Sequence, residues 1–114
     1  GILALQTAGV HVVLGSDSGN WPVFLWEFHG ATTVRELELL CEAGLTPTEA
    51  LVAGTVRGAA LLGISDDYGT IEVGKKASFV VLPASPLEDP SVYRNPTWVI
   101  HEGERRAPGD WVSN

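Results

Sequence analysis

Residues 11–19 place the strongest constraint on how this 114-residue chain can fold. They read His-Val-Val-Leu-Gly-Ser-Asp-Ser-Gly, a short apolar run rich in β-branched residues that follows Gly9 and ends among further glycines. This pattern predicts a buried strand with Asp17 at its C-terminal tip. In parallel α/β architectures the ligand-binding groups cluster where strands end, so we expect Asp17 to act as a metal ligand or a general base.

The composition indicates a globular protein and argues against several kinds of partner. Apolar residues make up 45% of the chain and charged residues 18%, as in a folded domain. The net charge of −7 repels phosphate backbones and anionic lipids, so we expect no nucleic-acid partner and no membrane partner. A single cysteine, Cys41, cannot form an internal disulfide, and no leader-like or spanning apolar stretch is seen. We therefore expect a cytoplasmic protein.

Aromatic side chains are concentrated directly after the predicted strand, between residues 20 and 31. Trp21 and His29 lie near the two ends of this stretch. Such a loop can form one wall of a substrate pocket, or it can cover the end of a core, and both interpretations stay open. We name Trp21 and His29 as candidate substrate-binding residues. A direct metal role for His29 is less favoured, because a histidine without a partner at ligand spacing is more often structural.

Helical patterns are expected in the first half of the chain. Residues 2–8 are typical of the last turns of a helix closed by a glycine. A second helix is predicted over residues 33–44, opening with a Thr33–Glu36 capping box. A third is predicted over residues 46–63, opening with a Thr46–Glu49 capping box and containing small residues that permit close packing.

The second half of the chain favours β structure. Short strands are predicted at residues 70–73, 79–82 and 98–101, and the last of these turns back into residues 104–106. Residues 83–96 contain four prolines and no periodicity, which indicates an ordered surface connection.

A series of short motifs runs in order through nearly the whole chain. They are Gly-Ser-Asp-Ser at residues 15–18, Thr-Pro-Thr-Glu-Ala-Leu at 46–51, Ala-Ala-Leu-Leu-Gly at 59–63, Gly-Thr-Ile-Glu-Val-Gly-Lys-Lys-Ala at 69–77 and Val-Ile-His-Glu-Gly at 99–103. Together they resemble the C-terminal part of the metal-dependent amidohydrolase superfamily, nearest its imidazolonepropionase-like and prolidase-like branch. The resemblance implies an α/β fold: residues 1–64 would be the last strand and helices of a (β/α)₈ TIM barrel, and residues 65–114 part of a small β-sandwich.

The same resemblance implies a catalytic and metal-binding role for Asp17. In the family, the aspartate that ends the eighth strand contacts one or two divalent ions, usually zinc, and takes the proton from the metal-bound water. That water then attacks an amide, lactam or similar carbonyl. A divalent cation lowers the pKa of its water toward about 7, and a nearby carboxylate can accept the proton. The His-Gly pair at residues 29–30 is similar to a loop that lines the substrate cleft.

Several family motifs have no counterpart in this sequence. They are the His-x-His pair of the first barrel strand, the lysine of the fourth strand, and the histidines of the fifth and sixth. Because a catalytic zinc needs three or more protein ligands, we expect the chain alone to bind no zinc stably and to hydrolyse nothing. Ser78 stands where the family has aspartate, which changes a local structural contact.

Three functions follow from this reading. The first is the C-terminal portion of a metal-dependent amidohydrolase that hydrolyses C–N bonds in a small-molecule amide, lactam or dipeptide-like substrate. The second is a stand-alone binding or assembly module, a homo-oligomer, because an unpaired apolar strand at residues 11–17 is a template for association. The third is an independent enzyme that uses Asp17 with His29. It is the least favoured, because no nucleophile or oxyanion donor can be named.

Overall fold

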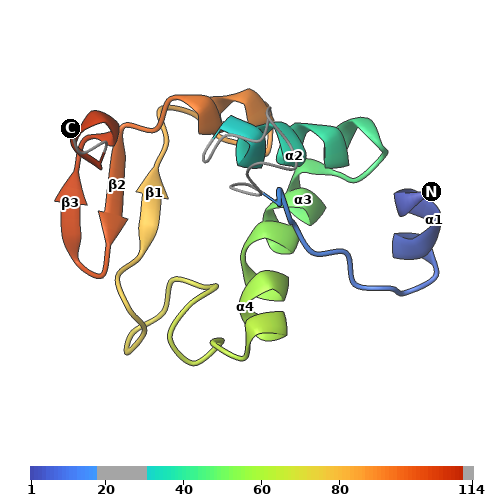
Figure 1. The fold of residues 1–114 in the computed structure, drawn as a ribbon, viewed down its shortest axis with the longest axis horizontal. Helices are drawn as coiled ribbons and strands as arrows, with labels where there is room; N and C mark the ends of the chain where they lie inside the picture. The colour runs from blue at the N-terminus through green and yellow to red at the C-terminus, as the bar shows by residue number, and fades with distance from the viewer. Residues whose placement is uncertain (18–30, 112–114) are drawn as a thin grey trace.

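The computed structural model describes residues 1–17 and 31–111, so the candidate residues Trp21 and His29 lie outside the described residues. Figure 1 shows a group of helices beside a small sheet, with the long connections between them running along two sides. The elements in chain order are α1 (Ile2–Thr7), α2 (Ala31–Glu42), α3 (Pro47–Gly54), α4 (Val56–Leu62), β1 (Phe79–Val81), η1 (Pro90–Arg94), β2 (Trp98–His101), β3 (Glu104–Arg106) and η2 (Pro108–Trp111), where η marks a 3₁₀ helix. Within the described ranges, no helix has the length and apolarity needed to cross a bilayer.

Helix α2 begins earlier than the sequence predicts. Residue Ala31 is already helical, so Thr33 lies inside α2 and the predicted Thr33–Glu36 capping box is wrong. The Thr33 hydroxyl instead donates a hydrogen bond to the Ser16 hydroxyl at 3.3 Å. A threonine at this place in the sequence satisfies the capping pattern, but its side chain is used in a long-range contact.

The capping box at the start of α3 is confirmed. The Thr46 side chain accepts the backbone N–H of Glu49 at 3.2 Å, and the Glu49 carboxylate accepts the backbone N–H of Thr46 at 2.8 Å. The predicted single helix over residues 46–63 is wrong, because Thr55 interrupts it with φ −127° and ψ −88°. The Thr55 hydroxyl donates to the Leu51 carbonyl at 2.7 Å. The backbone N–H of Thr55 bonds to the Val52 carbonyl at 3.3 Å, so the hydroxyl takes the place of that N–H at the Leu51 carbonyl. The preceding Gly54 lowers the helix propensity at this point.

The sheet is antiparallel, with strand order β1-β2-β3. Val80 lies opposite Val99, and Ile100 lies opposite Arg105. The predicted strands at 79–82, 98–101 and 104–106 are thus confirmed. The two-residue turn of the β2–β3 hairpin is a local signal, and β1 is a short apolar run of β-formers, so both can be recognised from sequence.

Two other predicted strands are wrong. Residues 70–73 form no strand, and the Lys75 ammonium donates to Thr70 Oγ1 at 2.7 Å. Residues 11–17 form no β-ladder, although the Leu14 N–H bonds to the Ala53 carbonyl at 3.1 Å. A buried parallel strand requires strands on both sides, and the described residues supply none there.

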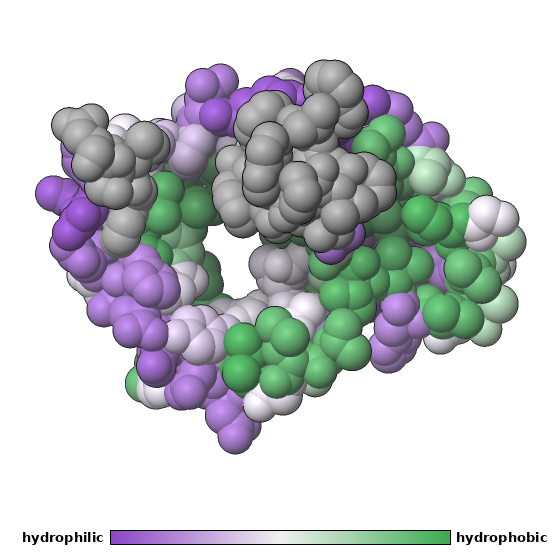
Figure 2. Space-filling model, in the orientation of Figure 1, coloured by the Kyte–Doolittle hydropathy of each residue, from purple (hydrophilic) through white to green (hydrophobic). Residues whose placement is uncertain are grey.

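The hydrophobic core is small and lies between α2 and α3. Its buried residues are Leu37, Leu40, Leu45, Ala50 and Ala53, with Val12, Leu14, Cys41 and Tyr93 packed against it. Many large apolar side chains lie outside this core, and Figure 2 shows them on the outside of the helices and around a hollow between helices and sheet.

Candidate functional site

The segment that carries Asp17 is fixed on α3. Leu14, three residues before Asp17, donates its backbone N–H to the Ala53 carbonyl and packs its side chain against the core. The close approach depends on Gly54, since a Cβ at that position would lie 3.2 Å from Leu14 Cδ2. The small residues of α3 therefore bring this segment close to the helix backbone.

Arg57 on α4 fixes the same segment from the other side. Its guanidinium donates to Gln6 Oε1 at 2.9 Å and to the Val12 carbonyl at 3.5 Å, so it joins α1, α4 and the segment before Asp17. A lone arginine in a helical pattern is usually solvated, and its partners here are far away in sequence. The sequence therefore offers no signal for this positioning role.

Asp17 itself is exposed and has a left-handed backbone. Its φ is 53°, which is uncommon for a residue other than glycine, although aspartate tolerates it better than most. Ser16, the residue before it, accepts the hydrogen bond from Thr33 on α2. Uncommon backbone conformations are found often at functional sites, so this geometry is compatible with the role predicted for Asp17. Its predicted companions, Trp21 and His29, fall outside the described residues.

The described residues do not form a metal site on their own. In residues 1–17 and 31–111, no three histidine, cysteine, aspartate or glutamate side chains gather in a geometry able to hold an ion. Burial of Cys41 on α2 raises the pKa of its thiol, which disfavours the thiolate that metals bind. A bound metal therefore does not fit the donor set of the described part of this chain.

A mostly apolar cavity of about 690 Å³ lies between the helices α3 and α4, the loop that follows α4, and strand β1. Leu14 reaches its wall, but Asp17 does not line it. The Tyr93 hydroxyl, on another wall, is buried and has no hydrogen-bond partner in the described part of the chain. A buried hydroxyl normally forms a hydrogen bond. The Tyr93 hydroxyl is therefore available to bind a polar group that enters the cavity.

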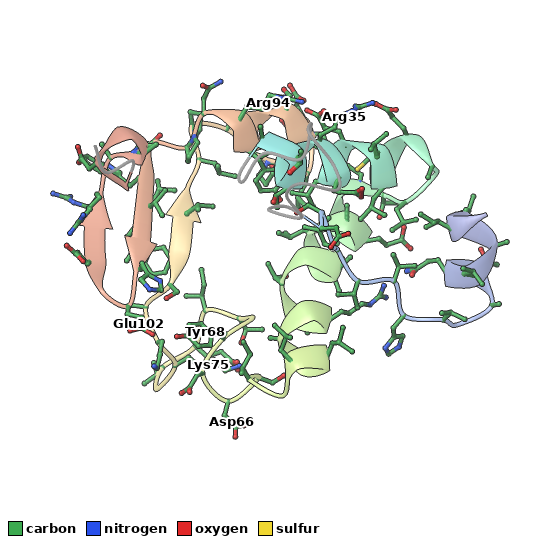
Figure 3. All side chains as sticks on the ribbon, in the orientation of Figure 1. Arg35, Asp66, Tyr68, Lys75, Arg94 and Glu102 are labelled. Carbon is green, nitrogen blue, oxygen red and sulfur yellow. The ribbon has the colours of Figure 1, made fainter. Side chains whose placement is uncertain are left out.

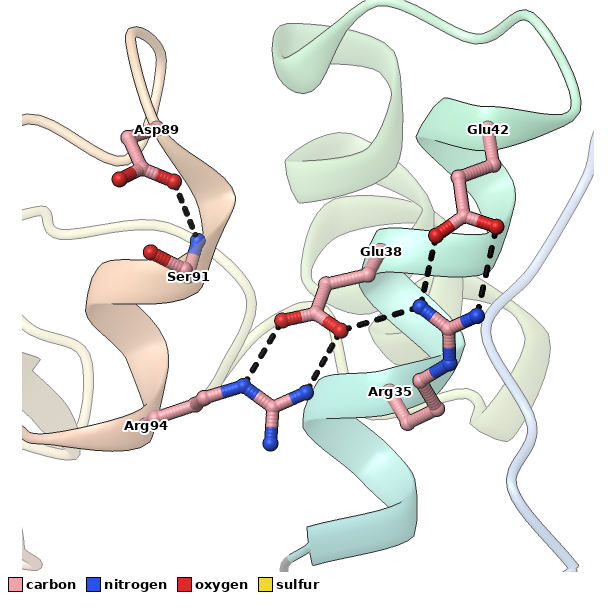
Figure 4. A network of polar contacts seen from close by, with 6 residues as sticks. All are labelled: Arg35, Glu38, Glu42, Asp89, Ser91 and Arg94. Carbon is pink, nitrogen blue, oxygen red and sulfur yellow. Dashed lines mark hydrogen bonds and ion pairs between the residues drawn. The ribbon is translucent and has the colours of Figure 1, made fainter.

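Charged side chains form a network that fastens η1 to α2 (Figures 3 and 4). Arg94 donates to both oxygens of Glu38, at 2.8 and 2.6 Å, and Arg35 bridges Glu38 and Glu42. The hydrogen bonds from Arg94, and then those from Arg35, lower the pKa of the Glu38 carboxyl. The spacing of Arg35 and Glu38 on one helix face could have indicated the local pair, but not the contact with Arg94.

Comparison with known proteins shows which family the chain belongs to. The model of the amidohydrolase family matches residues 2–106. The chain belongs to the amidohydrolase family. Among curated amidohydrolase relatives, an imidazolonepropionase of Deinococcus deserti is 42% identical over 87 residues, which are 75% of this chain and 20% of that protein. A 5'-deoxyadenosine deaminase of Methanobrevibacter smithii is 38% identical over 68 residues, 60% of this chain and 16% of that protein.

Solved amidohydrolase structures share the fold described above. A putative prolidase from Bifidobacterium longum superimposes with a TM-score of 0.80 and 38% identity, covering 90% of this chain and 24% of that one. A Xaa-Pro dipeptidase with bound methionine in its active site gives a TM-score of 0.79 and 30% identity, with 91% and 24% covered. The chain thus spans about a quarter or less of the relatives it matches. Members of the family typically use metal ions and act on small molecules.

Proposed function

We propose that this chain is the C-terminal portion of an amidohydrolase that hydrolyses C–N bonds in small-molecule substrates. The observation that carries the proposal is the family match over residues 2–106. The relatives named deaminase, imidazolonepropionase and Xaa-Pro dipeptidase all point to hydrolysis of C–N bonds. In this proposal residues 1–64 contribute the last helices of a TIM barrel, residues 11–17 pair as its last strand only beside the rest of the barrel, and residues 65–114 are part of a β-sandwich.

The exposed apolar side chains support the proposal that this segment packs against further polypeptide. Leu61 and Leu62 at the end of α4 are each 72% exposed, and Ile71 in the following loop is 83% exposed. Neighbouring apolar residues left open in this way commonly mark a surface that packs against other polypeptide. We propose that the remaining parts of a barrel and a sandwich cover them.

In this proposal Asp17 supplies the catalytic carboxylate. An exposed carboxylate held by an anchored segment can take a proton from the attacking water on one of its Oδ atoms and return it to the leaving nitrogen. The C–N bond breaks, a C–O bond forms, and the water supplies both protons that the products need. Trp21 and His29 are proposed to line the substrate cleft. One or two zinc ions are proposed for the whole enzyme, held mainly by ligands beyond the described residues.

A chimera tests this function directly. Residues 2–106 would replace the matching quarter of the B. longum prolidase-like protein, and the product would be assayed with zinc on dipeptides, N-acyl amino acids and lactams. We expect hydrolysis, and a fall in kcat of at least about 100-fold in the Asp17→Asn version. The matched control is Asp66→Asn, which changes an exposed aspartate in the turn after α4 and is expected to keep full activity.

Two results would count against the proposal. A chimera that folds and retains its metal but hydrolyses none of these substrates would overturn the amidohydrolase function. A chimera whose Asp17→Asn version works as well as the parent would remove the role of Asp17 and leave the function standing. Metal content and circular dichroism, measured on each version, separate these outcomes from misfolding.

A second candidate function is favoured by the same open apolar surface. The chain alone would be a homo-oligomeric binding or assembly module, in which a second copy covers residues 11–17 and the end of α4. Light scattering on the purified chain tests this, and a monomer at high concentration would exclude it. We place the protein in the cytoplasm in either case, because its one cysteine suits a reducing compartment.

A further inference from the structure

The turn of the β2–β3 hairpin carries an unexpected residue. Glu102 has φ 48° and Gly103 has φ 87°, the left-handed conformations that a tight two-residue hairpin turn demands. Glycine and asparagine adopt them easily, whereas a glutamate at the first position pays a steric cost between Cβ and its own backbone. We therefore expect the Glu102 side chain to make a contact that offsets this steric cost.

The Glu102 carboxylate makes that contact with the loop that joins α4 to β1 (Figure 3). It accepts a hydrogen bond from the Tyr68 hydroxyl and pairs with the Lys76 ammonium at 3.1 Å. The Lys76 ammonium also lies 5.6 Å from the centre of the Tyr68 ring. Two loop side chains thus contact one carboxylate. The hydrogen bond from Tyr68 contributes most to lowering the pKa of Glu102, and the hydrogen bond from Lys76 contributes next.

Backbone contacts extend this junction. The Glu102 N–H donates to Ser78 Oγ at 3.0 Å, so Ser78 joins the hairpin turn to the end of the loop. The Gly103 N–H donates to the Ala77 carbonyl at 2.8 Å. Within the loop, the Lys76 N–H donates to the Asp67 carbonyl at 3.0 Å, which holds the two ends of the loop together.

The loop over residues 65–78 is also a wall of the apolar cavity. Tyr68, Thr70 and Ile71 line the cavity from the loop, and Phe79 lines it from β1. On the far side of the molecule, the sheet is tied to the helices through η1 and the network around Glu38. Within the described ranges, the junction at Glu102 and the network around Glu38 are thus polar contacts on two sides of the cavity.

We infer that Glu102, Tyr68 and Lys76 form a latch that holds the 65–78 loop against the hairpin and sets how far the apolar cavity opens. Release of the carboxylate frees the loop, while the hairpin turn keeps its shape. The latch is a conformational device of the fold, and it does not depend on the catalytic role proposed for Asp17.

The variant Glu102→Gly tests the latch in the 114-residue chain. Glycine suits the left-handed turn, so the hairpin and the urea midpoint are expected to be kept, while the latch is lost. Hydrogen exchange at the Lys76 amide is expected to speed up by about fivefold or more, together with tryptic cleavage after Lys75 and Lys76. Tyr68→Phe, which removes a single hydroxyl, is expected to shift both readouts in the same direction.

Glu104→Gln is the matched control, since Glu104 lies beyond the same turn and its carboxylate contacts Arg106 rather than the loop. It is expected to leave loop exchange within about twofold of the parent. Unchanged exchange and cleavage in both Glu102→Gly and Tyr68→Phe would overturn the latch. Equal acceleration in Glu104→Gln would overturn it too, because the effect would then be general to the hairpin.

Discussion

Gly69→Ala tests how the loop after α4 is seated on the helix. Gly69 has φ 99°, and a Cβ built there would lie 2.8 Å from Ala59 Cβ and 3.4 Å from the Thr55 carbonyl oxygen. The left-handed backbone alone costs an alanine about 1–2 kcal/mol. Overpacking against a short side chain and the backbone of α4 adds about 1–3 kcal/mol. We therefore expect the free energy of unfolding to fall by about 3 kcal/mol.

Gly74→Ala separates the two contributions. Gly74 has almost the same φ, 94°, but nothing lies within 4 Å of a Cβ at that position. It should cost only the backbone contribution, about 1–2 kcal/mol. Urea unfolding followed by circular dichroism measures both variants, and an unchanged m-value shows that the same surface is exposed on unfolding.

A third variant completes the test. In an Ala59→Gly background the clashing methyl group is absent, so Gly69→Ala should become about as mild as Gly74→Ala. Equal costs for Gly69→Ala and Gly74→Ala in the parent chain would refute the reasoning. The loop would then not rest on α4 where the structure places it.

Three further predictions concern the core, the charged network and the helix cap. Leu40→Ala, at a side chain only 4% exposed, should lower the free energy of unfolding by about 3 kcal/mol, whereas Leu61→Ala, at 72% exposed, should change it by less than about 0.5 kcal/mol in urea melts. Arg94→Lys keeps the positive charge but loses the two-pronged contact, so the pKa of Glu38 should rise toward its ordinary value in an NMR titration. The backbone and side-chain hydrogen bonds from its N-cap residue lower the pKa of Glu49 below the ordinary 4.5. The stability that the ionised cap adds is therefore complete above pH 4.5 and is lost as the pH falls through the lower folded-state pKa. Urea midpoints from pH 7 to 3 should show this loss, and Glu49→Gln should lessen it.

The elements that could be predicted from sequence are those with local signals. The Thr46–Glu49 capping box and the left-handed Gly63 that ends α4 both act within one turn of chain, and both are found where the pattern indicates. The β2–β3 hairpin is local in the same way. The interruption at Thr55 has no local signal, because a bond from a threonine hydroxyl to the carbonyl four residues earlier occurs in continuous and in broken helices alike.

The candidate site depends on contacts that sequence patterns do not contain. An apolar run rich in valine indicates a strand, but strand pairing around residues 11–17 requires neighbours far away in sequence. The anchors of that segment, Ala53 and Arg57, are likewise distant in the chain and lie on helices. Asp17 is a candidate because it ends the apolar run. The role assigned to it remains a prediction, as do those of Trp21 and His29.

The contact between Leu14 and Gly54 means that α3 influences the position of the Asp17 carboxylate without touching it. A methyl group at position 54 would force Leu14 to retreat by a few tenths of an ångström, and Asp17 is only three residues further along. Catalytic geometry is sensitive to displacements on this scale, with about 1 Å able to cost a hundredfold in rate. Reactivity at such a centre can therefore be tuned, or spoiled, from the C-terminal end of a helix whose own atoms never meet the reactants.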